Sequence, residues 1–134
     1  MCCYMKESTK EWILIGEEDL SLAIAARKQH IYRQACYHSQ QCAEKFLKAV
    51  LDHISDINTH THDLLMLVTE IGARSTMEIP EEIRVACTVL SQYGVAAQYP
   101  GFTTEEEDSE EAFIIAQKIK SYCEGLLAEE PENS

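Results

Sequence analysis

The chain has 134 residues, which suits one compact domain, and a domain of this size buries roughly two-thirds of the surface that its unfolded chain exposes. Its 23 Asp and Glu residues outnumber its 11 Lys and Arg residues, so the formal net charge is −12. This charge opposes broad association with nucleic-acid phosphates and with anionic membrane surfaces. No run of 18 apolar residues is present, so we expect no membrane-spanning helix.

The six cysteines indicate a reducing compartment. They form no C-x-x-C pair, and Cys36, Cys42, Cys87 and Cys123 fall inside helical patterns, where cysteine acts as a small buried hydrophobe. The N-terminal sequence lacks the apolar stretch of a secretory signal. We therefore expect a cytoplasmic protein.

Hydrophobic spacing is helical along nearly the whole chain. After a flexible N-terminus at residues 1–10, a first helix is expected to place Trp12, Ile15, Leu22 and Ala26 on one broad apolar face. A second helix is predicted from about Tyr32 to Ile54.

Three further helices are predicted in the second half of the chain. Thr61 is expected to cap a helix that starts at His62. Pro80, followed by two glutamates, marks the start of another helix, which the YPGFTT turn ends. The last helix is expected to begin near Ser109.

These elements predict an all-α, up-and-down bundle of four or five helices. The domain is expected to occupy residues 11–127, and the acidic tail at residues 128–134 is expected to be disordered. Residues 73–79 are the one ambiguous stretch, and no segment predicts a strand convincingly.

The second predicted helix has two unlike faces. An apolar arc of roughly 160° contains Ala35, Cys36, Cys42, Ala43, Phe46, Leu47, Ala49, Val50 and Ile54. The opposite, polar arc contains Gln34, Gln40, Gln41, Glu44, Lys45 and Lys48, with His38 at the boundary. So wide an apolar arc is typical of a helix that lies between several neighbours or at a subunit interface. The polar arc is interpreted as lying outside the core.

Two features of the polar arc have chemical meaning. Glu44 and Lys48 are in the favourable order for a helical ion pair, worth a few tenths of a kcal/mol, about 0.2–0.5. His38, Gln41 and Lys45 share one narrow strip, where an imidazole, an amide and an ammonium can converge on an anion. The alternative is a solvated helix face with a histidine at its boundary, which the residue types alone favour.

Other polar clusters give weaker signals. His60, His62 and Asp63 lie close in sequence, but zinc sites need three or four ligands and no second Cys or His cluster has ligand spacing. We therefore expect no metal site and no cofactor. Six acids at residues 105–111 suit the start of a helix, or present an acidic surface to a basic partner.

The segment RQACYHSQQCAEKFLKAVL, at residues 33–51, closely resembles the signature helix of HEPN domains (higher eukaryotes and prokaryotes nucleotide-binding domains). In that helix an aromatic residue and a histidine or similar residue precede a Q-Q-A-x-E-K-x-L-K-A core. Further matches follow in the expected order: HDLLML at 62–67, LSQYGVAAQYPG at 90–101, and the closing helix EEAFIIAQKIKSYCEGLL. The likeness covers about residues 10–127.

The resemblance implies a helical bundle that is commonly a homodimer and is often encoded beside a small nucleotidyltransferase subunit. It also implies one of two activities. Some HEPN proteins are metal-independent ribonucleases, and others are non-catalytic proteins that bind a nucleotide or complete a partner enzyme. The ribonuclease branch uses an arginine, usually followed by a polar residue, and a histidine after a short spacer. Arg33, Gln34 and His38 satisfy that spacing.

One departure from the family pattern argues against the ribonuclease branch, and a second weakens the expectation of nucleotide binding. Arg33 and His38 lie inside the signature helix rather than on a later one, and a straight helix would leave their side chains roughly 140° apart. Gln98 stands before the Tyr99-Pro100 dipeptide, where many family members have an arginine, so a charged hydrogen-bond donor is missing there.

We therefore expect a non-catalytic, homodimeric HEPN subunit that binds a nucleotide or assists a minimal nucleotidyltransferase in a toxin–antitoxin-like pair. His38, Gln41 and Lys45 would form the nucleotide or partner contact. One alternative is a ribonuclease toxin in which His38 is the general acid or base, Arg33 stabilises the phosphate charge and RNA is the substrate. The other is a helical oligomerisation module without a ligand.

Overall fold

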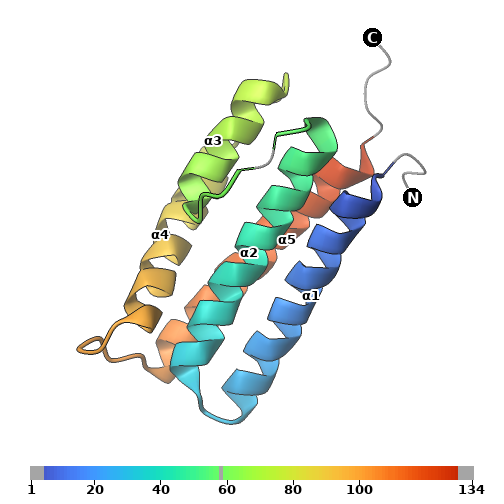
Figure 1. Ribbon diagram of the computed structural model, residues 1–134. Coiled ribbons are helices and arrows are strands. Elements are labelled where there is room, and N and C mark those ends of the chain that lie inside the picture. Colours follow the sequence, from blue (N-terminus) through green and yellow to red (C-terminus); the bar gives the residue numbers. More distant parts are fainter. Residues whose placement is uncertain (1–4, 58, 130–134) are drawn as a thin grey trace.

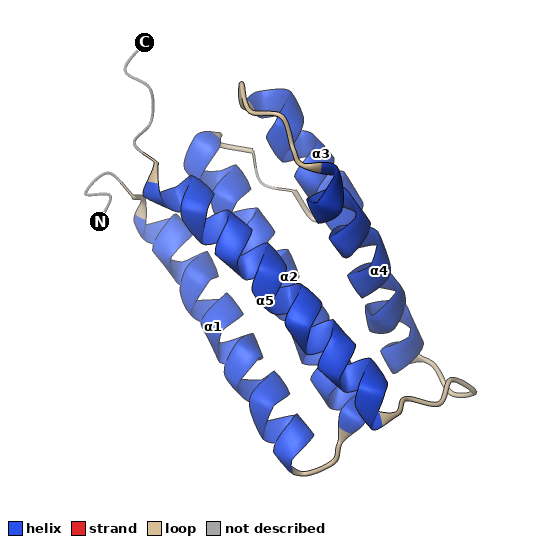
Figure 2. Cartoon of the chain, turned by 180° about the vertical axis from the view of Figure 1, so that it is seen from behind, coloured by secondary structure: helices blue, strands red, loops and turns tan. Residues whose placement is uncertain are grey.

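The computed structural model describes residues 5–57 and 59–129. Figure 1 shows five helices: α1 (Glu7–Lys28), α2 (Tyr32–Ile54), α3 (Leu64–Arg74), α4 (Glu81–Gln98) and α5 (Glu106–Ala128). Seen from behind, α5 lies between α1 and the α3–α4 pair (Figure 2). The described residues contain no strand, so the prediction of an all-α bundle is confirmed. None of the helices is long and apolar enough to cross a bilayer within those residues.

Helix α2 is the centre of the bundle, because it packs against each of the other four helices. Its bounds agree with the predicted helix from Tyr32 to Ile54. The predicted apolar arc is buried with one exception, since Ile54 at the helix end remains 36% exposed. Burial of this arc against several neighbours supplies the main apolar contribution to folding.

The interpretation of the polar arc as lying outside the core was wrong for its central residues. Gln40, Glu44 and Lys48 are all buried. Helix α1 covers one part of this arc, with the Lys48 ammonium 5.4 Å from the centre of the Trp12 ring. The connection before α3 covers another part. The periodicity of α2 identified its polar side correctly but contained no information about what packs on it.

Helix α1 buries only small side chains fully, and its large residues Trp12, Ile13 and Leu20 pack against the core while partly exposed. Its buried residues are Thr9, Gly16, Ala23 and Ala26, whereas Leu22, which was expected on the inner face, is 50% exposed. A methyl group on Gly16 would lie 2.8 Å from the Phe46 ring of α2. The absence of a side chain at Gly16 therefore sets the distance between these two helices.

Replacing Gly16 with alanine should destabilise the domain relative to replacing Gly125. Both glycines lie inside helices, so each change gains helix propensity, up to about 1 kcal/mol. Only the new methyl at position 16 must displace a core ring, whereas the one at position 125 meets nothing within 4 Å. Overpacking should therefore lower the free energy of unfolding of the Gly16→Ala variant by about 1–3 kcal/mol. Urea unfolding of both variants measures this difference, and equal stabilities would contradict the close contact.

Two predicted helix starts need correction. Helix α3 starts at Leu64, because the Asp63 carboxylate accepts hydrogen bonds from the Leu65 and Met66 amides at 3.0 and 3.3 Å. Thr61 is therefore not the cap. Helix α5 starts at Glu106, where Glu105 and Asp108 form a reciprocal capping box.

The ends of the predicted domain also differ from the structure. Helix α1 begins at Glu7, inside the stretch predicted to be flexible, and the Lys6 ammonium bonds the Asp52 carbonyl at 2.7 Å and the Asp56 carboxylate at 2.8 Å. In the ambiguous stretch at 73–79, residues 73 and 74 end α3, and residues 75–79 belong to the connection between α3 and α4. Of the tail predicted to be disordered at residues 128–134, Ala128 completes α5, and residues 130–134, like Cys2 and Cys3, lie outside the described residues.

Candidate functional site

A polar groove of about 470 Å³ lies between α2, the start of α3 and the end of α4. Its polar lining consists of Tyr37, Gln40, Gln41, His62, Asp63, Ser91 and Gln98. The close approach of α4 to α2 depends on Gly94, because a methyl group there would lie 2.6 Å from Cγ of Gln40. Three glutamine side chains from two helices thus meet in one groove, whose volume lies within the range of small-molecule sites.

A chain of hydrogen bonds orients the groove side of α2. The Lys45 ammonium donates to Oε1 of Gln41 at 2.7 Å, and Nε2 of Gln41 donates to Oε1 of Gln40 at 3.0 Å. On the α4 side, Nε2 of Gln98 donates to the Gly94 carbonyl at 3.1 Å. Within the described residues the Ser91 hydroxyl has no hydrogen-bond partner. The groove therefore presents ordered amides together with an unused hydroxyl.

A charged cluster centred on Glu44, whose side chain is 0% exposed, is linked to the groove through His62. The carboxylate is 3.3 Å from the Lys45 ammonium, 3.2 Å from the Lys48 ammonium and 3.1 Å from Nδ1 of His62. Burial pushes the pKa of Glu44 up, but Lys45, the His62 hydrogen bond and Lys48 outweigh it and lower that pKa below its ordinary value. Two ammonium groups thus share one carboxylate, whereas the groove lining itself contains neither lysine and includes the Asp63 carboxylate.

His38 does not join that groove. Its Nδ1 lies 3.0 Å from an Asp19 carboxylate oxygen on α1, and both side chains are largely buried. The predicted strip is therefore divided: Gln41 and Lys45 are hydrogen-bonded to each other, and Gln41 lines the groove, while His38 pairs with α1.

Arg33 is held by backbone carbonyls at the end of α4 and in the turn that follows. Its Nη1 donates to Ala97 at 3.3 Å and to Tyr99 at 3.0 Å, and its Nη2 donates to Phe102 at 2.9 Å. The Ala97 carbonyl lies in the last turn of α4, and those of Tyr99 and Phe102 come after it, so none of them has an intrahelical partner. Arg33 and His38 thus contact different helices and form no common site within one copy of the chain.

The remaining sequence candidates show no reactive arrangement. The buried thiols of Cys36, Cys42, Cys87 and Cys123 all have a raised pKa, mainly because burial disfavours the thiolate, and the pKa of Cys36 is about 11. Around His60 and His62, as elsewhere in residues 5–57 and 59–129, no three metal-ligating side chains gather.

Comparison with known proteins identifies the family. The HEPN domain family matches residues 9–126, which is most of the chain. This chain belongs to the HEPN family. A HEPN domain protein of Thermotoga maritima has a similar structure, at 25% identity and a TM-score of 0.72 over 90% of this chain and 99% of that one. An archaeal HEPN homologue matches at 27% identity and a TM-score of 0.71 over 87% and 95% of the two chains.

Two further relatives extend the comparison. A Thermus thermophilus protein shares the fold at a TM-score of 0.81 and 23% identity, over 90% of this chain and 99% of that one. A candidate toxin of Methanocaldococcus jannaschii is 50% identical over 42 residues, which are 31% of this chain and 28% of that protein. This HEPN domain thus spans less than a third of the length of that relative.

Sequence reasoning missed two residues of the groove and undervalued a third. His62 was assigned to the start of α3, yet its imidazole reaches Glu44, which lies 18 residues earlier in the chain. No motif or spacing in the sequence pointed to Ser91. Gln98 was noticed because it replaces a family arginine, and only the fold places it opposite Gln41.

Proposed function

We propose that this HEPN domain is a non-catalytic subunit that binds a nucleotide in the groove between α2 and α4 and works with a small nucleotidyltransferase. The observation that carries the proposal is the meeting of Gln40, Gln41 and Gln98 in one groove, where the Lys45 ammonium donates to Gln41. Amides supply both donors and acceptors, as the edge of a base requires, and an ammonium suits a phosphate.

The state of Arg33 supports the non-catalytic part of the proposal. A ribonuclease of this family would use the arginine to stabilise charge on the scissile phosphate. Here the guanidinium donates its hydrogen bonds to the carbonyls of Ala97, Tyr99 and Phe102. Releasing it toward RNA would leave those carbonyls without a partner, which costs free energy if they are desolvated.

Restoring an arginine at position 98 should strengthen nucleotide binding. The Gln98→Arg variant adds a charged donor at the groove edge, and a hydrogen bond to a charged group contributes about 1.5–3 kcal/mol, which corresponds to about tenfold or more in affinity. Calorimetric titration with ATP at low salt measures the change. The matched control is Gln92→Arg, which adds the same charge on the same helix in a different groove. Equal gains in affinity in both variants would show that the added positive charge alone explains the effect. The absence of ATP binding in every variant would refute the site.

The partner part of the proposal rests on the family and on the similarity to a candidate toxin. The subunit would act as one half of a toxin–antitoxin-like pair and would itself dimerise. Exposed apolar side chains at the end of α4 suit such contacts, since Val95 and Tyr99 are each 56% exposed and Phe102 is 52% exposed. Co-purification from native lysate should recover a nucleotidyltransferase, and sedimentation should show a dimer. A strict monomer without that enzyme would refute this part.

A second candidate function is RNA cleavage centred on His38. The Asp19 carboxylate orients the imidazole at 3.0 Å, an arrangement that fixes the ring of a general acid or base. Incubating the protein with RNA in EDTA tests this activity. Cleavage that is lost in both His38→Ala and Asp19→Asn would favour the ribonuclease over the non-catalytic subunit.

A further inference from the structure

The outer face of α4 lacks the charges that cover the other helices. The segment at residues 85–104 contains most of α4 and the turn after it, and it has neither a charged residue nor a histidine. It is the longest such stretch in a chain in which 25% of the residues are charged. A helix at the surface of a domain normally places charged side chains opposite its buried face, so this composition needs a physical reason.

Five exposed residues form one line along this face, which we call the α4 stripe. They are Val85, Thr88, Gln92, Val95 and Tyr99. Their spacing alternates between three and four residues, which keeps them within an arc of about 80°. Figures 1 and 2 show α4 at one side of the bundle. More than half of Val85, Val95 and Tyr99 is exposed, and large apolar side chains aligned on one surface are typical of a protein interface.

Net charge favours a second copy of the chain as the occupant of the α4 stripe. Each copy has a net charge of −12, so two copies repel each other wherever their acidic faces meet. The exposed side of α5, for example, carries Glu106, Glu107, Glu110 and Glu111. A contact between two uncharged stripes avoids this repulsion, whereas a basic partner would gain more by binding an acidic face.

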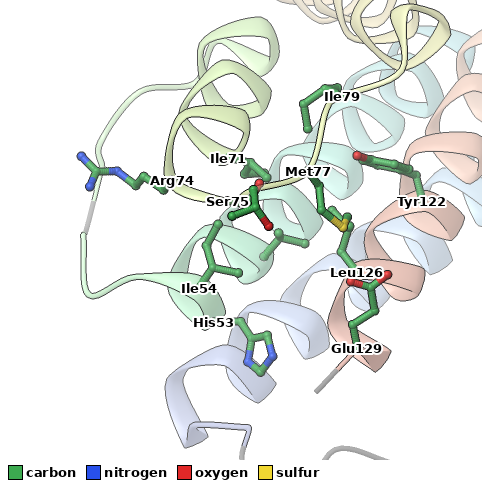
Figure 3. A pocket seen from close by; sticks show the side chains of 12 residues that line it. His53, Ile54, Ile71, Arg74, Ser75, Met77, Ile79, Tyr122, Leu126 and Glu129 are labelled. Carbon is green, nitrogen blue, oxygen red and sulfur yellow. The ribbon is translucent and has the colours of Figure 1, made fainter. Parts of the chain in front are cut away.

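The apolar cavity at the ends of α2, α3 and α5 is a poorer surface for such a contact. Figure 3 shows Arg74, His53 and Glu129 among the side chains that line it. A second copy that docked there would remove these ionisable groups from water, which costs free energy unless each finds a new partner. The α4 stripe contains no ionisable group with a pKa near neutrality, so its burial avoids that cost.

The order of side chains in the α4 stripe is self-complementary in an antiparallel pair. Gln92 is at the centre, with Thr88 and Val95 on its two sides and Val85 and Tyr99 beyond them. A twofold axis at Gln92 therefore places Val85 of one copy against Tyr99 of the other. The two Gln92 amides meet at the axis, where each can donate to the other and accept from it. Closed twofold dimers use one patch on both copies in this way.

We propose that a second copy of this HEPN domain binds antiparallel along the α4 stripe, with Gln92 on the twofold axis. The inference rests on the dimerisation in the proposed function, and it adds the face and the register of the contact. Gln92 and Val85 do not line the nucleotide groove, so variants at these positions test the contact without changing the groove lining.

Sedimentation velocity over a range of protein concentrations tests the face. The wild type should be a dimer, and Gln92→Arg, which sets two like charges at the axis, should raise the dimer Kd at least about tenfold. The matched control is Leu14→Arg, which adds the same charge at a 58% exposed apolar position on α1 and should leave the dimer Kd unchanged. Both positions are exposed, so circular dichroism should show a retained helical fold.

A charge exchange tests the antiparallel register. Val85→Lys and Tyr99→Glu should each weaken the dimer when introduced alone, because each buries an unpaired charge. The double variant, whose net charge equals that of the wild type, should recover the dimer, because the lysine at 85 of one copy meets the glutamate at 99 of the other. A parallel pair would place lysine against lysine and would not recover.

Several outcomes would overturn the proposal. A dimer that survives Gln92→Arg would place the contact elsewhere and leave the proposed dimerisation intact, and a double variant that stays monomeric would exclude the antiparallel register. A wild type that is monomeric alone, and that loses a co-purifying nucleotidyltransferase in Gln92→Arg, would assign the stripe to that enzyme instead. ATP titration of the same variants tests nucleotide binding separately, because the groove is lined by one copy.

Discussion

Replacing Glu44 with glutamine should lower the free energy of unfolding by about 3–5 kcal/mol, the cost of removing one partner from a buried charged group. The variant keeps the shape of the side chain but leaves the Lys48 ammonium, whose side chain is only 8% exposed, without a counter-charge. Lys45, with a 16% exposed side chain, loses the same partner. Urea unfolding near pH 7 measures the change.

The matched control is Glu70→Gln, which removes another carboxylate from a helical ion pair. The Glu70 side chain is 46% exposed and that of its partner Arg74 is 39% exposed, so solvent screens the pair. Such surface pairs contribute about 0–1 kcal/mol, and the control should change stability by less than that. A Glu44→Gln variant that is as stable as the control would show that the Glu44 cluster is not a structural element.

The Glu44 cluster should make the free energy of unfolding depend on pH. Because the pKa of Glu44 in the folded chain is below its ordinary value of 4.5, the unfolded chain binds the proton more readily, and stability rises with pH in that window. The Glu44 contribution is thus fully present above about pH 4.5 and is lost as the pH falls through the folded pKa. Unfolding curves at several pH values should give a shallower acid dependence for Glu44→Gln than for the wild type.

Replacing Arg33 with alanine should destabilise the domain by about 2–3 kcal/mol, because charged hydrogen bonds to backbone carbonyls are lost at one place. Arg33→Lys should recover only part of the loss, since one ammonium cannot reproduce the planar fork that reaches both Tyr99 and Phe102. Urea unfolding gives the size of the effect. Hydrogen exchange should locate it at residues 96–104.

A comparison with Arg74→Ala isolates the role of the carbonyls. Arg74 bonds only a Glu70 side chain on an exposed helix face, so its loss should change stability by less than about 1 kcal/mol. If Arg33→Ala were equally mild, the guanidinium would be free to serve another purpose. The structural interpretation of Arg33, and with it the main argument against ribonuclease activity, would then fail.

Periodicity predicted the helices well because their apolar faces recur at helical spacing. Helix α2 shows this most clearly, since its bounds and its buried arc both follow from the sequence. Helix ends were less predictable, because several polar residues compete for each cap. At α5 the Glu105–Asp108 capping box starts the helix, and Ser109, which looked like a natural start, lies buried inside it.

The candidate site was only partly predictable, because it depends on contacts between distant segments. The pairing of Gln41 with Lys45 follows from their spacing on one helix. The pairing of His38 with Asp19 and the approach of His62 to Glu44 do not, since each joins residues from different segments. Gln98 could be singled out from the family pattern, but its position opposite Gln41 required the packing of α4 on α2 at Gly94.

The most direct test of the nucleotide groove is a titration of ¹⁵N-labelled protein with ATP, followed through the side-chain amide signals of its glutamines. The groove predicts saturable shifts for Gln40, Gln41 and Gln98, with the Gln92 signal, in another groove, as the internal reference. Backbone amide shifts in the same spectra that centre instead on His38 and Asp19, or glutamine signals that stay unmoved at saturating ATP, would contradict the groove as the nucleotide site.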